Sequence, residues 1–249
     1  MNRIELIQAL GYIWAAFGAY WMGFGMLRHS QADSADQGKR RLRIAILAIT
    51  FVALFEERHA ISPPWLIVLG VAWGATGLYW VTPKTAAQSG EFRFYRALRL
   101  LVLAATFALL FWERTAIGVL GIRFTPETPL VEIAGFVIAL CGIALALWAR
   151  INLGRYWSDK VELKVDHQLI RRGPYAHLRH PIYSGVLLGV AGTALLVGEW
   201  RAVLAFVILL VNYVIKAKRE DRILAGAFAE FDDHKRQAGF LLPNFRRRG

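Results

Sequence analysis

The sequence predicts an all-α protein, a polytopic transmembrane helical bundle of about seven spans. Three observations favour this class. Apolar residues make up 56% of the 249 residues, the mean hydropathy is +0.39, and the apolar residues fall in long blocks. Lys and Arg lie between these blocks, so the net charge of +12 indicates topology signals and contacts with membrane lipids rather than nucleic-acid binding. Two apolar runs near the C-terminus, joined by residues 198–201, are typical of a helical hairpin.

Five apolar segments precede residue 150. They are residues 4–27, 42–55, 65–81, 98–112 and 130–148, and polar loops at 28–41 and 82–94 separate some of them. The N-terminus lacks a basic region and a small-residue cleavage site, so the first segment is expected to be retained as a span. The second and fourth segments have apolar cores that are short for a full crossing.

The first half of the chain contains an internal repeat. Residues 42–61 align without gaps on residues 98–117, with 12 identities in 20 positions. The first four spans therefore look like a duplicated helical hairpin, related in parallel because the offset covers two crossings. Both copies end in a Glu-Arg pair that we interpret as charge at the membrane interface. We expect residues 1–127 to be a transmembrane scaffold.

The distribution of basic residues predicts the topology. When residues 28–43, 82–99, 150–182 and 216–249 are placed on one side, that side holds 25 of the 30 Lys and Arg residues. Cytoplasmic loops carry such an excess, so the N-terminus is expected outside and the C-terminus in the cytoplasm. The expected location is a multi-pass position in a bacterial cytoplasmic membrane.

After residue 150 the pattern changes. The apolar runs 183–197 and 203–215 form the predicted hairpin, which returns the chain to the cytoplasmic side. The second helix is expected to continue into water over residues 216–222, and residues 224–236 are predicted to form a separate amphipathic helix.

A polar stretch, RRGPYAHLRHPIYSG at residues 171–185, comes directly before the hairpin. Each proline biases the preceding residue away from helix, so Gly173 and His180 are expected to be extended or turning. Such a break frees backbone groups to face a ligand. The spacing of these residues does not exclude the alternative that this stretch is a basic cytoplasmic turn which carries His and Tyr by chance.

Because the hairpin reverses the chain, it should bring this turn close to the start of the polar part of the second helix. The side chains expected there are Tyr175, His180, Tyr183, Lys216, Arg219, Glu220 and Asp221. Lys216 and Glu220 are four residues apart on a helix and should share one face, where an ion pair is the simplest interpretation.

The residue pattern disfavours several chemistries. We find no Ser or Cys paired with His and a carboxylate, no spacing typical of a metal site, and no Gly-rich phosphate loop. The single cysteine, Cys141, lies within an apolar run. Polar and aromatic groups beside extended backbone suit a reaction that depends on holding two reactants in line, such as methyl transfer from a sulfonium.

At this point a family resemblance is apparent. Residues 169–188 (LIRRGPYAHLRHPIYSGVLL), then a hairpin, then residues 219–243 (REDRILAGAFAEFDDHKRQAGFLLP) resemble the integral-membrane isoprenylcysteine carboxyl methyltransferase family and its phospholipid methyltransferase relatives. The resemblance covers roughly residues 150–243. It implies S-adenosylmethionine as methyl donor in a C-terminal cytoplasmic pocket under the hairpin, a lipophilic acceptor from the bilayer, and a methyltransferase-like catalytic region at residues 128–249.

The resemblance also implies roles for individual residues. The cofactor-binding positions would be His167, Gln168, Leu169, Ile170, Tyr175, His180, Pro181, Tyr183 and Glu220. The catalytic positions would be Lys216, Glu220 and His180, without a metal. Lys216 stands where the family has arginine, so the bidentate fork that suits a carboxylate acceptor is replaced by a point charge. His234 stands where the family favours tyrosine, and we interpret it as an exposed helix residue.

Several functions remain open from sequence. A carboxylate acceptor would need no general base, whereas an amine acceptor, as in phospholipid methylation, would need His180 or Glu220 as the base. A thiol or quinone-type acceptor is a third choice. Outside methyl transfer, the alternatives are a nicotinamide-dependent enzyme like the membrane sterol reductases and a non-catalytic scaffold or transporter.

Overall fold

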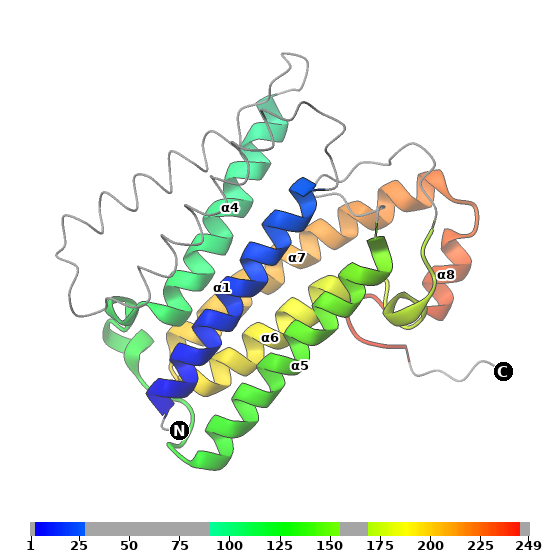
Figure 1. The fold of residues 1–249 in the computed structure, drawn as a ribbon. Helices are drawn as coiled ribbons and strands as arrows, with labels where there is room; N and C mark the ends of the chain where they lie inside the picture. The colour runs from blue at the N-terminus through cyan, green and yellow to red at the C-terminus, as the bar shows by residue number, and fades with distance from the viewer. Residues whose placement is uncertain (1–2, 28–89, 155–168, 245–249) are drawn as a thin grey trace. The chain divides into compact units, whose positions relative to one another are not determined.

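The computed structural model describes residues 3–27, 90–154 and 169–244. The chain divides into two compact units, Met1–Phe107 and Ala108–Gly249. The described elements are helical, as predicted (Figure 1). The expected spans at 42–55 and 65–81, and the first copy of the repeat, lie outside the described residues.

In the first unit, the described elements are α1 (Arg3–Leu27) and most of α4 (Gly90–Phe111). Trp14 of α1 is buried, and its ring meets Phe107 of α4 edge-on at 5.7 Å between centroids. We predicted a polar loop over residues 82–94, and the C-terminal boundary of this prediction is wrong, because α4 already begins at Gly90. The sequence of residues 90–94 has no proline that would prevent this start.

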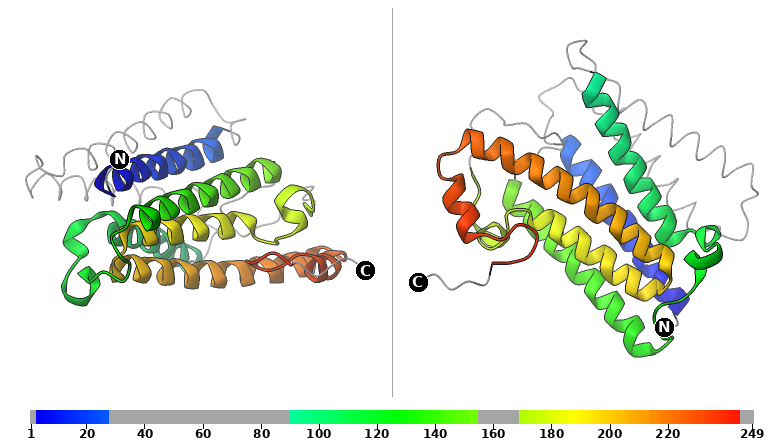
Figure 2. Two further views of the ribbon diagram at one scale, coloured as in Figure 1. Left: turned by 90° about the horizontal axis from the view of Figure 1, so that it is seen from below. Right: turned by 180° about the vertical axis from the view of Figure 1, so that it is seen from behind.

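The second unit contains three long helices followed by a short one. They are α5 (Pro129–Leu153), α6 (Pro181–Val197), α7 (Trp200–Ala227) and α8 (Phe231–Gln237). In both views α6 lies between α5 and α7 (Figure 2). The boundaries of α5 follow from local chemistry. The Thr128 side chain caps the first turn, and Pro129 occupies the first helical position, where the backbone N–H has no partner within the helix. Gly154 ends the helix with a φ of 53°.

Small residues let α5 and α6 pack with their backbones in contact. A Cβ atom built on Gly142 would lie 2.2 Å from the backbone nitrogen of Gly189, and one on Gly192 would lie 2.3 Å from that of Ala139. Atoms of side chains do not approach backbone this closely, so only glycine fits these positions. The small residues that are typical of membrane helix pairs therefore determine how closely α5 and α6 pack.

A tight turn connects α6 to α7 and completes the predicted hairpin. Gly198 adopts a left-handed conformation at φ 74°, which ends α6 and reverses the chain. Arg201, at the start of α7, is buried and donates hydrogen bonds to the carbonyls of Leu109 and Trp112 at 2.9 and 3.2 Å. Its second partner is the Glu199 carboxylate at 2.6 Å. This arginine provides a donor for the Leu109 carbonyl, which is one of the last four of α4 and has no donor within that helix.

Two described helices, α5 and α7, are long and apolar enough to cross a membrane. Residues 101–111 and α6 form shorter apolar helices among the described residues. The helical class and the membrane helices agree with the prediction, while the number of about seven spans remains a prediction.

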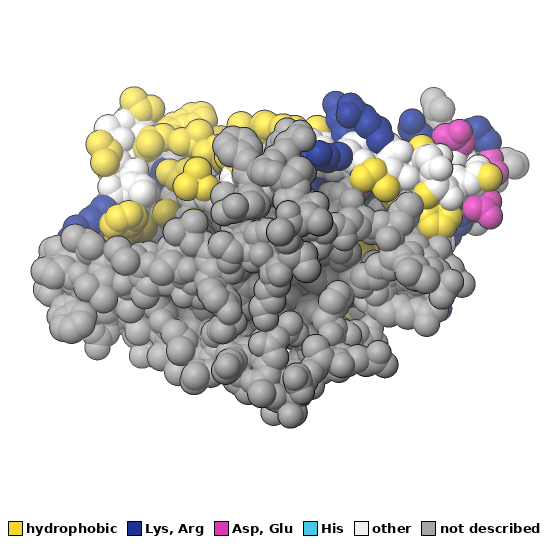
Figure 3. Space-filling model, turned by 90° about the horizontal axis from the view of Figure 1, so that it is seen from above, with side chains coloured by type: hydrophobic (Ala, Val, Ile, Leu, Met, Phe, Trp, Pro, Cys, Tyr) yellow, Lys and Arg dark blue, Asp and Glu magenta, His cyan; other side chains and the backbone are white. Residues whose placement is uncertain are grey.

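The polarity of α7 changes along its length. Its exposed hydrophobic residues Val207, Val211 and Ile215 are followed by exposed Lys218 and Arg219. Most of the charged side chains on the face drawn in Figure 3 likewise lie toward one end. The change near residue 216 is where a membrane helix would leave the hydrocarbon region.

The helix predicted at 224–236 is wrong as a single element. Residues 224–227 are the last turn of α7, and α8 begins only at Phe231. Phe228 ends α7 with an extended backbone at φ −127° and ψ 117°. The break places Phe231 and His234 toward the interior of the unit, where both are buried.

Candidate active site

The polar turn before α6 has the broken backbone that its prolines predict. Arg172 is extended, Gly173 takes a left-handed φ of 58°, and residues Gly173–Ala176 form a single 3-10 turn. A Cβ on Gly173 would lie 2.5 Å from the Asn152 side-chain oxygen, so glycine is required for conformation and for space. His180, the last residue before α6, is non-helical at φ −124° and ψ 58°.

The hairpin brings this turn against α7, as predicted, and the contact centres on Glu220. One carboxylate oxygen of Glu220 accepts a 2.6 Å hydrogen bond from the Tyr183 hydroxyl and lies 4.0 Å from the Lys216 ammonium. The other oxygen is 3.5 Å from Nδ1 of His180. Three groups from two helices and the turn therefore hold one carboxylate, whose side chain is 23% exposed.

Asp221 is a second carboxylate on α7 that faces the same imidazole. Its Oδ1 lies 2.8 Å from Nε2 of His180, and its Oδ2 lies 3.5 Å from Nε of Arg179. Asp221 was expected near the site from sequence, but no role was predicted for it. Its pairing with His180 follows from the hairpin geometry, which sequence spacing does not specify.

Aromatic rings form one side of this cluster. Tyr183 stacks on Tyr213 with centroids 4.7 Å apart and on the His180 ring at 5.5 Å. The Lys216 ammonium lies 5.2 Å from the centroid of Tyr183. Tyr213 was not predicted, although its spacing of three and seven residues from Lys216 and Glu220 places all three on one helix face.

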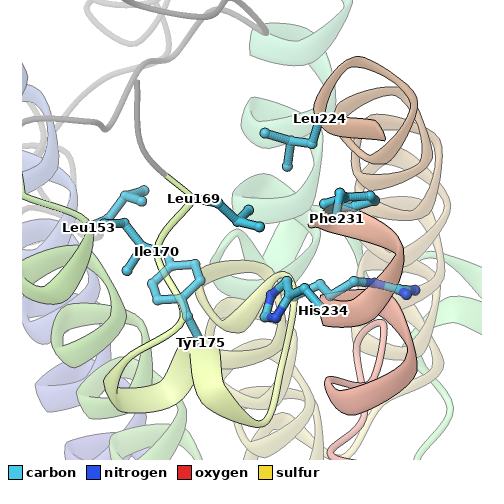
Figure 4. A pocket seen from close by; sticks show the side chains of 8 residues that line it. Leu153, Leu169, Ile170, Tyr175, Leu224, Phe231 and His234 are labelled. Atoms are coloured by element: carbon cyan, nitrogen blue, oxygen red, sulfur yellow. The ribbon is translucent and has the colours of Figure 1, made fainter. Parts of the chain in front are cut away.

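A pocket lies next to the cluster and is mostly apolar (Figure 4). It encloses about 60 Å³, and its lining residues are Leu153, Leu169, Ile170, Tyr175, Arg179, Leu224, Phe231 and His234. The lining residues with polar side chains are Tyr175, Arg179 and His234. Burial, followed by the negative charge of Glu220, raises the pKa of Tyr175 far above its usual range, so its hydroxyl remains protonated.

The cofactor positions implied by the resemblance divide into three groups. Leu169, Ile170 and Tyr175 line the pocket. His180, Tyr183 and Glu220 form the charged cluster beside it, and Pro181 is buried at the first position of α6. His167 and Gln168 lie outside the described residues. Their contacts with a cofactor remain predictions.

The prediction that His234 is an exposed helix residue is wrong. His234 is 3% exposed and points into the pocket from α8. Burial, together with the positive charges of Arg171 and Arg179, lowers the pKa of His234 to about 4. The imidazole is therefore neutral at physiological pH, and the pocket contains a polar but uncharged group at this position.

This low pKa predicts an acid-dependent loss of stability. A histidine whose pKa falls from its usual 6.5 to about 4 on folding binds protons more readily in the unfolded chain, so stability falls as the pH drops from about 6.5 towards 4. We expect His234→Gln to reduce this loss, measured as the melting temperature in detergent at pH 7.5 and pH 4.5. The control is His177→Gln, which removes an exposed imidazole from the neighbouring turn. If wild type and His234→Gln lose the same stability in acid, the lowered pKa of His234 is not the cause of that loss.

Residues 238–244, which we name the C-terminal strap, hold the turn in place. The backbone N–H of Arg179 donates to the carbonyl of Gly239 at 2.8 Å, and the N–H of Gly239 donates to that of His177 at 3.0 Å. The Ser184 hydroxyl donates to the carbonyl of Leu241 at 2.7 Å. Phe240 meets the His180 ring edge-on at 5.4 Å. The strap thus forms one wall of the cluster.

The second unit thus combines long apolar helices, a proline-broken turn and a charged cluster beside an apolar pocket. Residues 134–226 match the isoprenylcysteine carboxyl methyltransferase (ICMT) family. Over these residues the chain is ICMT-like, which confirms the resemblance predicted from the sequence motifs. The match begins in α5 and ends in α7, so it includes the turn, the hairpin and both carboxylates.

The chain is also similar to individual proteins of known name. The chain is 32% identical over 108 residues to the cobalt-zinc-cadmium resistance protein CzcN of Cupriavidus metallidurans, covering 43% of this chain and 48% of that protein. It is 28% identical over 124 residues to the protein-S-isoprenylcysteine O-methyltransferase of Saccharomyces cerevisiae, covering 48% and 52%. The chain therefore spans about half the length of these curated relatives. A solved eukaryotic intramembrane Ras methyltransferase ICMT matches 97% of this chain and 95% of its own, with 16% identity and a TM-score of 0.49.

Proposed function

We propose that this protein transfers a methyl group from S-adenosylmethionine to a lipophilic acceptor at the membrane, most like isoprenylcysteine carboxyl methylation. The observation that carries the proposal is the Glu220 carboxylate, held by Tyr183, His180 and Lys216 directly beside an apolar pocket. The family match and the curated isoprenylcysteine methyltransferase relatives support the reaction class.

The residues present fit this cofactor. Aliphatic and aromatic side chains, one neutral imidazole and the Arg179 side chain line the pocket, and such a mostly apolar lining suits a purine ring. A carboxylate next to stacked tyrosines suits a positively charged group, and Glu220, Tyr183 and Tyr213 provide this. When bound, the cofactor supplies an electrophilic methyl group on a positively charged sulfur. Glu220 would hold the positive end, and Leu169, Ile170 and Tyr175 would hold the apolar end.

The arrangement of the proton-carrying groups favours an acceptor that is already anionic. Both nitrogens of His180 face carboxylates, and both oxygens of Glu220 face donors. Neither group is positioned to remove a proton from an incoming amine, because each is already bound to protein partners. A carboxylate acceptor needs only desolvation and in-line approach, which positioning residues can provide. A phospholipid amine is the less favoured acceptor, and a thiol or quinone acceptor remains an alternative.

Lys216 is the residue that we assign to acceptor recognition. It lies where the exposed apolar face of α7 ends at Ile215, so its ammonium is at the level of lipid headgroups. An acceptor with a lipid tail could lie along this face and present its polar group to Lys216. Its ammonium lies 4.0 Å from the Glu220 carboxylate, and its side chain is 16% exposed.

Replacing Lys216 should therefore change acceptor kinetics. For an anionic acceptor, we expect Lys216→Gln to raise the acceptor KM or lower kcat by roughly 10- to 100-fold, because a charge-assisted contact contributes about 1.5–3 kcal/mol. Lys216→Arg should be tolerated or improved, since its guanidinium can bind a carboxylate with two hydrogen bonds. Steady-state kinetics with a farnesylated cysteine would measure this, with Lys218→Gln as a control at an exposed lysine of the same helix. Unchanged kinetics in Lys216→Gln would mean that Lys216 only forms an ion pair with Glu220 and does not recognise the acceptor.

A binding titration distinguishes methyl transfer from the other function classes. Purified protein in detergent would be titrated with S-adenosylhomocysteine and, separately, with NADPH. Binding of S-adenosylhomocysteine alone supports the proposal, and binding of NADPH alone would instead indicate a reductase of the sterol-reductase type. Binding of neither would favour a scaffold or transporter. Transfer of labelled methyl groups from S-adenosylmethionine to farnesylcysteine, phosphatidylethanolamine, a thiol or a quinone would then identify the acceptor.

A further inference from the structure

We propose that Asp221 is a positioning residue that keeps His180 in its doubly protonated form, so that His180 can orient the Glu220 carboxylate. The inference deepens the proposed function, because it rests on Glu220 binding the cofactor. It assigns a separate task to each of two adjacent acidic residues on α7. Glu220 would contact the ligand, whereas Asp221 would act only through the imidazole.

The contacts of Asp221 fix its own orientation first. One oxygen lies 2.8 Å from Nε2 of His180 and the other 3.5 Å from Nε of Arg179. The Asp221 side chain is 15% exposed, and that of His180 is 5% exposed. A carboxylate held at both oxygens in a nearly buried position cannot rotate away without losing one of its two cationic partners.

The imidazole is fixed in the same way by its surroundings. Tyr183 stacks on one face with an interplanar angle of 11°, and Phe240 of the C-terminal strap meets the ring edge-on. The Arg179 guanidinium lies 5.4 Å from the centroid of Phe240, so the strap and the turn support each other. With the ring plane fixed, Nε2 must face Asp221 and Nδ1 must face Glu220.

This geometry determines the protonation state of His180. A neutral imidazole has one N–H and could donate to only one of the two carboxylates, which would leave its other nitrogen facing a carboxylate oxygen without a proton. An imidazolium has two N–H groups and matches both acceptors. Burial lowers the pKa of His180, but hydrogen bonds to Asp221 and Glu220 outweigh burial, and the net pKa is raised.

Other ionisable groups surround the ring. Those on neighbouring elements are Arg179 on the turn, Tyr183 on α6, Lys216, Glu220 and Asp221 on α7, and His234 on α8. The cations oppose the proton on His180, so the two carboxylates must supply the attraction. Asp221 is the carboxylate closer to the ring, because its Oδ1 lies 2.8 Å from Nε2 whereas Oε2 of Glu220 lies 3.5 Å from Nδ1.

The test measures His180 directly. Protein labelled with 13C-histidine would be titrated in detergent by NMR, with His180→Gln used to assign the resonance. In the wild type we expect His180 to be protonated at pH 7. In Asp221→Asn, which keeps the shape but removes the charge, we expect the midpoint to fall by at least one pH unit. Asp233→Asn is the control, because it removes an exposed carboxylate of α8 that pairs with Arg236.

The second measurement is the dissociation constant of S-adenosylhomocysteine at pH 6 and pH 8. We expect Asp221→Asn to bind roughly 10-fold more weakly than wild type at pH 8, where the variant has lost the proton on His180, and nearly as well at pH 6. An equal loss at both pH values would indicate a merely structural effect and overturn the proposal. A neutral His180 at pH 7 in the wild type would also overturn it, even if the variant did not fold. Failure of the wild type to bind S-adenosylhomocysteine would defeat the proposed function, whereas the His180 midpoint would still test the role of Asp221.

Discussion

Replacing Glu220 with alanine should abolish measurable binding of S-adenosylhomocysteine while the protein still folds. The carboxylate is the common partner of Tyr183, His180 and Lys216. Its removal takes away a negative charge beside Lys216 and His180, and the positive charges that remain next to the pocket would repel the positively charged part of a ligand. Losing hydrogen bonds to charged groups costs about 1.5–3 kcal/mol each, so we expect a loss of affinity of roughly 100-fold or more.

The experiment is a titration of purified variants by calorimetry. Glu220→Gln serves as a second variant that keeps the size of the side chain and should also lose binding. Glu230→Ala is the control, because it removes an exposed carboxylate just before α8. The loss should be greater for S-adenosylmethionine than for S-adenosylhomocysteine, since only the former has a charged sulfur. If the folded Glu220→Ala protein binds with wild-type affinity, Glu220 is not part of the binding site.

Adding one methyl group at Gly142 should destabilise the second unit severely. The new Cβ would lie 2.2 Å from the Gly189 nitrogen and 2.6 Å from the Gly185 carbonyl oxygen. Both neighbours are backbone atoms, so α5 and α6 would have to separate, and their interlocked glycines would lose contact along the pair. Overpacking of this kind costs about 1–3 kcal/mol and sometimes more, which corresponds to a fall in melting temperature of roughly 5–10 °C.

Thermal unfolding of Gly142→Ala in detergent, followed by tryptophan fluorescence, would test this. Gly226→Ala is the matched control on α7, because a Cβ at that position meets nothing within 4 Å. Alanine also has the higher helix propensity, so the control should be neutral or slightly stabilising. If both variants melt at the wild-type temperature, the close approach of α5 and α6 is wrong.

The sequence was sufficient to predict the hairpin and the non-helical turn. Apolar run length and the four-residue connection determine where α6 and α7 reverse, and Pro174 and Pro181 determine where helix cannot form. Chain reversal then brings His180 and Tyr183 to Glu220. These features depend on local rules, so they could be read from one sequence.

Features that depend on packing between distant segments could not be predicted in the same way. His234 is buried because α7 ends at Ala227 and α8 turns back, and nothing in the residues 224–236 alone requires that break. The pairing of Asp221 with His180, rather than with solvent, depends on the rotation of α7 about its axis. Gly142 and Gly185 were visible as small residues, but their mutual contact requires the register of α5 on α6.

The C-terminal strap has a consequence for when the site can form. Ser184 and its strap partner Leu241 are separated by 57 residues, and most of α6 and all of α7 and α8 are synthesised between them. On a ribosome, the membrane helices can insert before the strap has been made, but the wall against His180 is still missing. The proposed binding site is therefore completed late in synthesis. A protease that cuts before Gly239 could switch the site off and leave every helix in place.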